Sequence, residues 1–226
     1  MAKVVITGAS NGAETSQAGG NVTPNYLERR RNRIEVFGLA EAMSDVVMIG
    51  DSITSLVEWS ELFPEVSIAN RSIGGDTTEG VLNRLDSVYS TGAKIAFLLI
   101  GINDISRGDS ADTVYSNYEK IIEDLLSHGV QPFIQSTILA GEVEKAFNPR
   151  VNELNNRLEK LAESKNVLFI DLNMHLEKDG ILNAEFTTDG IHLNAAGYRI
   201  WKRAIEPVLM QALVSAENTE NVTNTP

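Results

Sequence analysis

The chain has 226 residues, of which 42% are hydrophobic and 22% charged, a composition typical of one globular domain with a full core. Its net charge of −12 argues against nucleic acid and anionic membrane surfaces as partners, because both attract clustered Lys and Arg. The lack of cysteine excludes disulfides and thiolate chemistry, and the lack of any apolar run near the roughly 20 residues that span a bilayer argues against membrane insertion.

The first 23 residues contain a stretch, KVVITGASNG from Lys3 to Gly12, that resembles the glycine-rich opening of a short-chain dehydrogenase. A dinucleotide-binding turn needs a third glycine so that the helix can pack closely on the strand, and Glu14 occupies that place. Residues 1–23 are therefore expected to be an N-terminal extension without a catalytic role. One lysine and a short Val-Val-Ile run are too little for a signal peptide. As written, the chain is expected to be cytoplasmic, or secreted or periplasmic if a leader has been removed.

From residue 24 the sequence becomes regular, beginning with a predicted helix from Tyr26 to Leu39. This helix carries a cluster of arginines: Arg29, Arg30, Arg31 and Arg33. We interpret them as a solvated face that pairs with carboxylates of this acidic chain, rather than as a nucleic-acid patch.

Beyond this helix, short apolar runs alternate with longer segments of helical periodicity. The apolar runs are predicted to be strands: Val46–Ile49, Val66–Ala69, Ile95–Ile100, Pro132–Leu139 and Val167–Asp171. Helical spacing is clearest over residues 77–88, 115–126, 151–161 and 198–209. The unbroken run Ile95–Ile100 should be the central strand, covered on both faces.

This alternation predicts the fold class. Strands separated by helices of this length form right-handed crossovers, which give a parallel sheet with helices on both faces. About five strands predict a three-layer α/β/α, doubly wound sheet of the flavodoxin-like type, with its site at the carboxyl ends of the strands. We assign this domain to residues 24–213 and residues 214–226 to a polar C-terminal tail, which is expected to be disordered from Ser215 to Pro226.

Polar blocks follow the predicted strands, where such a sheet places its ligands. Ser52, in a Gly-Asp-Ser block between the first strand and a helical pattern, could act as a nucleophile or merely cap the helix. Gly74 and Gly75 could let a backbone N–H approach a substrate, or could form a plain turn. Asn103, in Gly-Ile-Asn-Asp, could donate to an oxyanion or cap the next turn.

A further block, before the last helix, contains one of the three histidines. Asp189 precedes His192 by three residues, close enough to hold the imidazole in one tautomer. His128 lies beside a helix-ending glycine and His175 lies in a polar stretch, so both are interpreted as structural or solvated. A metal is the alternative use of an Asp/His pair, but no third ligand stands at a suitable spacing, and no metal or other cofactor is expected.

Taken in order, these blocks resemble those of the SGNH (GDSL) hydrolase family. That family carries a serine in Gly-Asp-Ser, a glycine in a second block, an asparagine in Gly-x-Asn-Asp and a C-terminal Asp-x-x-His. The resemblance implies Ser52 as nucleophile, His192 as general base and Asp189 as the carboxylate that orients it. It also implies an oxyanion hole formed by the Ser52 amide, the Gly75 amide and the Asn103 side chain.

Two further stretches, GGDTTEGVLNRL from Gly74 to Leu85 and WSELF from Trp59 to Phe63, narrow the resemblance. They make the chain similar to platelet-activating-factor acetylhydrolase-like and carbohydrate acetylesterase-like members of the family. The absence of a GxSxG elbow argues against an α/β-hydrolase. Three acids next to the key residues are interpreted as groups that support turns rather than as acids in the reaction: Asp51, Asp76 and Asp104.

The expected activity is ester hydrolysis through an acyl-enzyme, with His192 accepting the Ser52 proton. The loop from Ala140 to Arg150 is mixed in polarity, which favours short acyl groups, above all acetyl, on a polar or sugar-like alcohol. A lysophospholipase or thioesterase is the alternative within the family, and a non-catalytic binding module is the alternative outside enzymes. The expected partner is thus a small-molecule ester, and a homodimer is left open.

Overall fold

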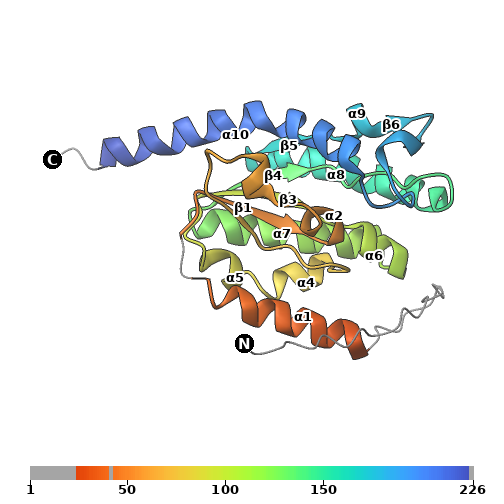
Figure 1. Cartoon of the computed structure of the whole chain (residues 1–226), viewed down its shortest axis with the longest axis horizontal. Helices are drawn as coiled ribbons and strands as arrows, with labels where there is room; N and C mark the ends of the chain where they lie inside the picture. Colours follow the sequence, from red (N-terminus) through yellow and green to blue (C-terminus); the bar gives the residue numbers. More distant parts are fainter. Residues whose placement is uncertain (1–23, 41–42, 224–226) are drawn as a thin grey trace, which may run out of the picture.

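The structure, a computed structural model, describes residues 24–40 and 43–223, with side chains for residues 25–40 and 43–218. The N-terminal extension predicted for residues 1–23, with its dehydrogenase-like stretch, lies outside the described residues. Within the described ranges a parallel sheet forms the centre of the molecule, and helices pack on both of its faces (Figure 1).

The central sheet has five parallel strands in the order β2-β1-β3-β4-β5. Their bounds are β1 Val46–Gly50, β2 Ile68–Asn70, β3 Ile95–Leu99, β4 Gln131–Gln135 and β5 Leu168–Ile170. This is the flavodoxin-like order, so the predicted three-layer, doubly wound architecture is confirmed. Every residue of β1 and β3 is buried, which explains why both strands read as unbroken apolar runs.

The helices divide between the two faces of the sheet. Their bounds are α1 Pro24–Phe37, α2 Ser52–Ser55, α3 Trp59–Leu62, α4 Thr78–Leu82, α5 Asp86–Tyr89, α6 Ile102–Arg107, α7 Ala111–Ser127, α8 Asn148–Lys165, α9 Asn173–Leu176 and α10 Ala195–Thr223, with 3-10 turns η1 Lys145–Phe147 and η2 Ala184–Phe186. Helix α10 runs along one face, α4 and α7 lie on the opposite side, and α1 lies outside α4 and α5 (Figure 1).

The start of α10 is fixed against the short helices that follow β1. The ring of Trp201 packs edge-on against Trp59 of α3, with 4.8 Å between ring centroids. The hydroxyl of Tyr198 donates a hydrogen bond of 2.6 Å to the carbonyl of Ile53 in α2. Because the loop with His192 leads directly into α10, these contacts bring that loop to the carboxyl end of β1.

Two predicted elements differ from the structure by more than two residues. The helix predicted for residues 77–88 is divided into α4 and α5. At the junction the Arg84 N–H bonds to the Val81 carbonyl three residues back, at 3.0 Å, and the Arg84 side chain donates to the Asp76 carboxylate at 2.7 Å. The strand predicted to reach Leu139 ends at Gln135. The Ser136 N–H still bonds to the Ile170 carbonyl of β5 at 2.9 Å, but beyond it the N–H groups of Thr137 and Leu139 donate to side chains, Asn155 Oδ1 at 2.8 Å and Asn173 Oδ1 at 3.0 Å. A small antiparallel hairpin, β6 Glu177–Lys178 and β7 Ile181–Leu182, was not predicted.

The prediction of disorder from Ser215 to Pro226 is wrong for most of that segment, because α10 continues as a helix to Thr223. The backbone of residues 224–226 lies outside the described part of the chain. Ala212, Leu213 and Ala216 still pack against the core, and this apolar stripe at helical spacing extends the helix beyond the expected boundary.

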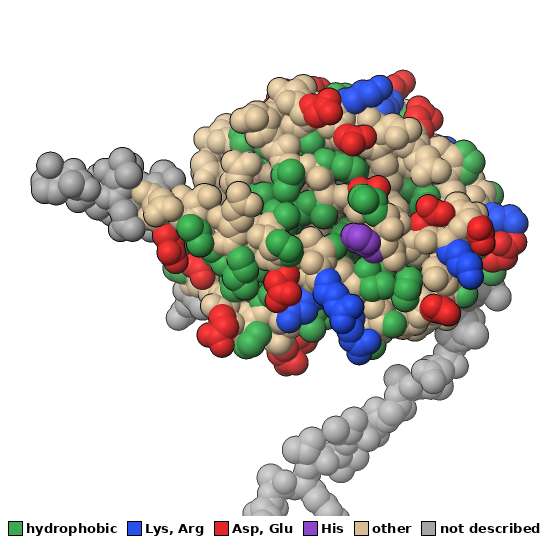
Figure 2. Space-filling model, turned by 90° about the horizontal axis from the view of Figure 1, so that it is seen from above, with side chains coloured by type: hydrophobic (Ala, Val, Ile, Leu, Met, Phe, Trp, Pro, Cys, Tyr) green, Lys and Arg blue, Asp and Glu red, His purple; other side chains and the backbone are tan. Residues whose placement is uncertain are grey.

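The face of the molecule on the α10 side carries charged side chains of both signs interspersed with apolar ones (Figure 2). Exposed apolar residues of α10 include Met210 and Val214. Among the described helices, none combines the length and the apolar composition that a bilayer span requires.

Candidate active site

Ser52 begins a helix at the carboxyl end of β1. Gly50, the last residue of the strand, has no room for a side chain, since an added Cβ would lie 2.3 Å from Thr54 Oγ1 and 2.4 Å from the Leu99 carbonyl. Asp51 caps α2 by accepting a 2.9 Å hydrogen bond from the Ile53 N–H. The cap is thus Asp51 rather than Ser52, which leaves the Ser52 hydroxyl available for another partner.

That partner is His192. Its Nε2 lies 2.9 Å from Ser52 Oγ, and its Nδ1 lies 2.7 Å from Asp189 Oδ2. With Nδ1–H donating to the carboxylate, Nε2 is the unprotonated nitrogen that can accept the serine proton. The structure therefore brings together Ser52, His192 and Asp189 in one hydrogen-bonded line.

The carboxyl group of Asp189 is fixed by its own loop. Its Oδ1 accepts the backbone N–H groups of Ile191 at 2.9 Å and His192 at 2.8 Å. Partial burial works against ionisation, but these hydrogen bonds, together with the one from the His192 ring, outweigh it and lower the pKa of Asp189. A carboxylate held in this way stays ionised and keeps the imidazole in one orientation.

The other two histidines lie away from this line. His128 Nδ1 lies 2.8 Å from the Asp124 carbonyl oxygen, and the His128 ring stacks on Tyr89 with 4.0 Å between centroids. His175 is exposed on α9. Neither lines the cavity that contains Ser52.

Gly75 follows β2 and lines the same cavity as Ser52. Its φ of +74° favours glycine, and an added Cβ would lie 2.8 Å from the Tyr26 ring. Its carbonyl oxygen accepts hydrogen bonds from Tyr26 Oη at 2.9 Å and from Arg107 Nη2 at 2.6 Å. Within the described residues the N–H groups of Ser52 and Gly75 have no hydrogen-bond acceptor, so both can donate to a ligand.

Asn103 connects the loops that carry Ser52 and Gly75. Its Nδ2 donates to the Asp76 carbonyl at 3.0 Å and to Asp51 Oδ2 at 3.3 Å. It does not cap α6, whose N-cap is Gly101 without a side-chain hydrogen bond. The predicted oxyanion donor thus lies beside both loops, with its amide already hydrogen-bonded within the protein.

The acids next to these residues are buried and hydrogen-bonded. Asp76 forms ion pairs with Arg84 at 2.7 Å and with Arg30 at 3.1 Å. Asp104 Oδ1 accepts the Thr78 N–H at 3.0 Å and the Thr78 hydroxyl at 2.5 Å.

Two of these acids have strongly shifted pKa values. Burial, together with the nearby carboxylates of Asp104 and Asp76, raises the pKa of Asp51 to about 7. Burial raises the pKa of Asp104 to about 6, although its hydrogen bonds from Thr78 oppose the shift. Their predicted role, to support turns rather than to act as acids, fits these contacts and stays a prediction.

Helix α1 contributes residues that the sequence did not indicate. Arg30 pairs with a carboxylate of the chain, that of Asp76, as expected. It is not part of a solvated face, however, because it turns inward and its Nη2 donates to the Gly80 carbonyl at 2.6 Å. Arg29 and Arg33 line the cavity with Ser52 and His192. No local signal could have shown this, because it depends on where α1 packs.

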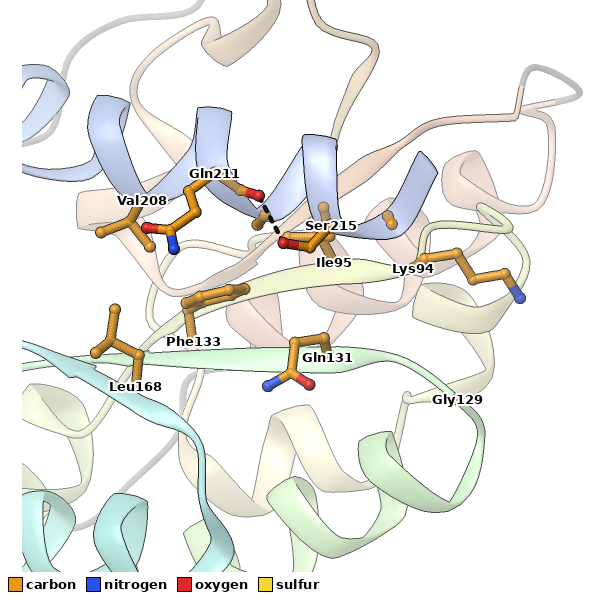
Figure 3. Close-up of a pocket in the computed structure, with 11 residues that line it drawn as sticks. Lys94, Ile95, Gly129, Gln131, Phe133, Leu168, Val208, Gln211 and Ser215 are labelled. Atoms are coloured by element: carbon orange, nitrogen blue, oxygen red, sulfur yellow. Dashed lines mark hydrogen bonds between the residues drawn. The ribbon is translucent and has the colours of Figure 1, made fainter. Parts of the chain in front are cut away.

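Two cavities lie at opposite ends of the sheet. The one with Ser52 and His192 has a volume of about 920 Å³. The other, of about 670 Å³, lies under α10 at the amino ends of β3 and β4, where Phe133, Leu168 and Val208 point into it (Figure 3). Of these two, the first contains the hydrogen-bonded pair of Ser52 and His192. Among the described residues, no group of three or more His, Asp or Glu side chains could hold a metal ion.

Comparison with known proteins agrees with this geometry. Residues 48–200 match the profile of the GDSL-like Lipase/Acylhydrolase family. The chain belongs to that family. The match covers the segment from β1 into α10, and so includes Ser52, Gly75, Asn103, Asp189 and His192. The predicted membership of the GDSL family is confirmed.

Relatives of this GDSL-family chain match it over different shares of their own length. Platelet-activating factor acetylhydrolase IB subunit alpha2 of Homo sapiens is 26% identical over 189 residues, which cover 79% of this chain and 82% of that protein. An N-acylneuraminate cytidylyltransferase of Streptococcus agalactiae is 27% identical over 146 residues, 65% of this chain and 34% of that protein. The chain thus spans about a third of the length of that relative.

A solved structure shares the fold. The GDSL-like lipase from Bacteroides thetaiotaomicron superposes with a TM-score of 0.73 at 22% sequence identity, over 83% of this chain and 99% of that one. At this identity the likeness concerns the fold alone.

Proposed function

We propose that this member of the GDSL family is a serine esterase that hydrolyses short-chain acyl esters, above all acetyl esters, through a triad of Ser52, His192 and Asp189. The observation that carries the proposal is the continuous hydrogen-bonded line from Ser52 Oγ through the imidazole to Asp189 Oδ2. A helix cap or a solvated histidine would not require either contact.

The proposed reaction has two halves. His192 Nε2 accepts the Ser52 proton as Oγ attacks the ester carbonyl, and the resulting imidazolium is stabilised by Asp189. The imidazolium then gives this proton to the leaving alcohol as the carbon–oxygen bond of the ester breaks. In the second half His192 removes a proton from water, the water oxygen attacks the acyl-enzyme, and the carboxylic acid leaves as Ser52 regains its proton.

The negative charge of the tetrahedral intermediate needs donors. The N–H groups of Ser52 and Gly75 are available, and we propose Asn103 as the third donor. Its amide would exchange the longer of its two contacts, the 3.3 Å hydrogen bond to Asp51, for the oxyanion. The shorter contact, to the Asp76 carbonyl, would keep the amide in place.

The short acyl preference rests on the cavity and on one relative. Serine, glycine and arginine residues dominate the wall around Ser52, with Ile73 as the one aliphatic side chain among the described lining residues, so a long acyl chain finds little apolar surface. The relative from Homo sapiens is named as an acetylhydrolase. Both favour a small acyl group on a polar alcohol.

The test is hydrolysis of p-nitrophenyl acetate, butyrate and octanoate by the wild type and by Ser52→Ala, together with labelling by a serine-reactive phosphonate. We expect acetate to be preferred, and both turnover and labelling to depend on Ser52. A preference for octanoate would replace the acetyl proposal with a lysophospholipase or thioesterase. If no ester is turned over and no label is incorporated, the chain is a binding module rather than an esterase.

A further inference from the structure

The cavity that contains Ser52 and His192 has an excess of positive charge in an acidic protein. Arg29, Arg30 and Arg33 of α1 all line it, whereas no aspartate or glutamate does so among the described residues. The whole chain carries a net charge of −12, so composition alone predicts the opposite sign at this wall. The sign of the charge is therefore set by the packing of α1 beside the site.

The ion pairs inside the protein do not neutralise this wall. The buried carboxylate of Asp76 accepts from Arg84 at 2.7 Å and also from Arg30 at 3.1 Å, so one negative charge is shared by two guanidinium groups. Arg30 is thereby fixed in the wall of the cavity, with a side chain that is only 21% exposed. Arg30, Arg84 and Asp76 together therefore carry one net positive charge.

Arg29 and Arg33 add two more positive charges. They are four residues apart on α1, which places both side chains on one face of the helix. Both are exposed, and neither forms an ion pair with a described carboxylate. The guanidinium of Arg33 instead lies over the Phe37 ring, 4.9 Å from its centroid.

A further cation lies behind this pair. The side chain of Arg71 also lies 4.9 Å from the centroid of the Phe37 ring. Burial, followed by the positive charges of Arg33 and Arg84, lowers the pKa of Arg71. Cations gathered in this way repel one another, and an anion bound between them would relieve that repulsion.

We propose that the substrate of this site is an ester that also carries an anionic group, a carboxylate or a phosphate, bound by Arg29 and Arg33. The proposal rests on the esterase function above and names its substrate class. The planar guanidinium fork matches both kinds of anion by paired hydrogen bonds. The cavity volume of about 920 Å³ leaves room for more than the acyl group at Ser52. The anionic group would occupy the side of the cavity formed by α1.

The test uses matched acetyl esters. 4-Acetoxybenzoate carries a carboxylate, 4-acetoxyphenyl phosphate carries a phosphate, and methyl 4-acetoxybenzoate is the neutral counterpart of the first. Release of the acetyl group is measured for the wild type, for Arg29→Gln/Arg33→Gln and for Arg31→Gln. Arg31 is the control, because it is exposed on the same helix, makes no described contact and does not line the cavity.

In the double variant we expect kcat/KM for at least one charged ester to fall at least tenfold more than for the neutral ester. Arg31→Gln should leave all three values within about twofold of the wild type. The charged-to-neutral ratio of the wild type should also decrease as ionic strength rises, because salt screens the attraction. The charged ester whose kcat/KM falls most in the double variant identifies carboxylate or phosphate as the preferred group. An equal loss for charged and neutral esters would overturn the proposal.

A binding measurement separates failure of this proposal from failure of the esterase function. Titration of Ser52→Ala with 4-hydroxybenzoate, followed by NMR, needs no turnover. Binding that is lost on adding Arg29→Gln/Arg33→Gln supports the anion site even if no ester is hydrolysed. Hydrolysis of the neutral ester without preference for either charged ester, and without such binding, would leave the esterase and reject the anion site.

Discussion

His192 Nε2 lies 2.9 Å from Ser52 Oγ although 140 residues of chain separate them. We expect Ser52→Ala and His192→Ala each to lower kcat for an acetyl ester by about four to six orders of magnitude, since the members of a triad act as a unit. Asp189→Asn should cost less, at most about 10⁴, because Asp189 orients the base and stabilises the imidazolium but takes no proton itself. The measurement is steady-state kinetics with p-nitrophenyl acetate.

The control for this prediction is His175→Ala, since His175 is exposed on α9 and does not line the cavity. It should retain wild-type kinetics. If His192→Ala kept more than a tenth of the wild-type kcat, His192 would not be the general base.

Gly75 offers a test of how α1 shapes the site. Gly75→Ala must adopt a φ of +74° and place a Cβ 2.8 Å from the Tyr26 ring. Gly108→Ala is the matched control, because Gly108 also has a positive φ, +94°, but nothing lies within 4 Å of an added Cβ. Gly108→Ala should lower the free energy of unfolding by about 1 kcal/mol from backbone strain. Gly75→Ala should cost at least about 1 kcal/mol more, because the Tyr26 ring must move.

Denaturant unfolding and esterase kinetics check this pair of variants together. Gly75→Ala should also lose activity, while Gly108→Ala should keep it. Equal stability and equal activity of the two variants would mean that the contact with Tyr26 has no consequence.

The buried ion pair of Asp76 and Arg84 should be sensitive to loss of one partner. Both side chains are 1% exposed, so Arg84→Met would leave a buried carboxylate with Arg30 alone. We expect the free energy of unfolding to fall by about 3–5 kcal/mol. In Asp76→Asn/Arg84→Met the buried carboxylate that lost its 2.7 Å partner is removed as well, and part of the loss should be recovered. The recovery should be incomplete, because Arg30 then loses its ion pair with Asp76.

The control is an ion pair at the surface, between Lys145 and Glu142, whose side chains are 58% and 69% exposed. Lys145→Met should leave unfolding nearly unchanged, because solvent screens such a pair. A similar loss from both lysine and arginine variants would contradict the difference in burial.

Asp51 should make stability depend on pH. Its pKa is raised from 3.8 to about 7 in the folded state, so the folded protein holds a proton that the unfolded chain releases near pH 4. The stabilisation linked to this proton is complete below about pH 4 and is lost as pH rises towards 7. Relative to Asp51→Asn, the wild type should lose up to about 4 kcal/mol over that range.

Unfolding by denaturant at several pH values measures this difference. Asp45→Asn, which changes an exposed carboxylate, is the control and should follow the pH dependence of the wild type. A constant difference between wild type and Asp51→Asn from pH 4 to 7 would show that Asp51 is ionised throughout.

Much of the fold could be predicted because its signals are local. The strands β1 and β3 are continuous apolar runs, and their burial on both faces follows directly from that pattern. The break between α4 and α5 could not be predicted, because Val81, Leu85 and Val88 are buried at helical spacing on both sides of it and the apolar pattern continues through the break. The helical tail was missed for a related reason: residues up to Ala216 pack on a core that the sequence alone does not display.

The sequence by itself determined the order of the elements and the residue types at the carboxyl ends of the strands. Those features depend on periodicity and turn chemistry within a few residues. Only the tertiary structure decided that Asn103 joins two loops and that α1 lines the cavity with arginines. The hydrogen bond from Arg30 to Gly80 spans 50 residues, and such contacts form only when packing of the whole core brings the two segments together.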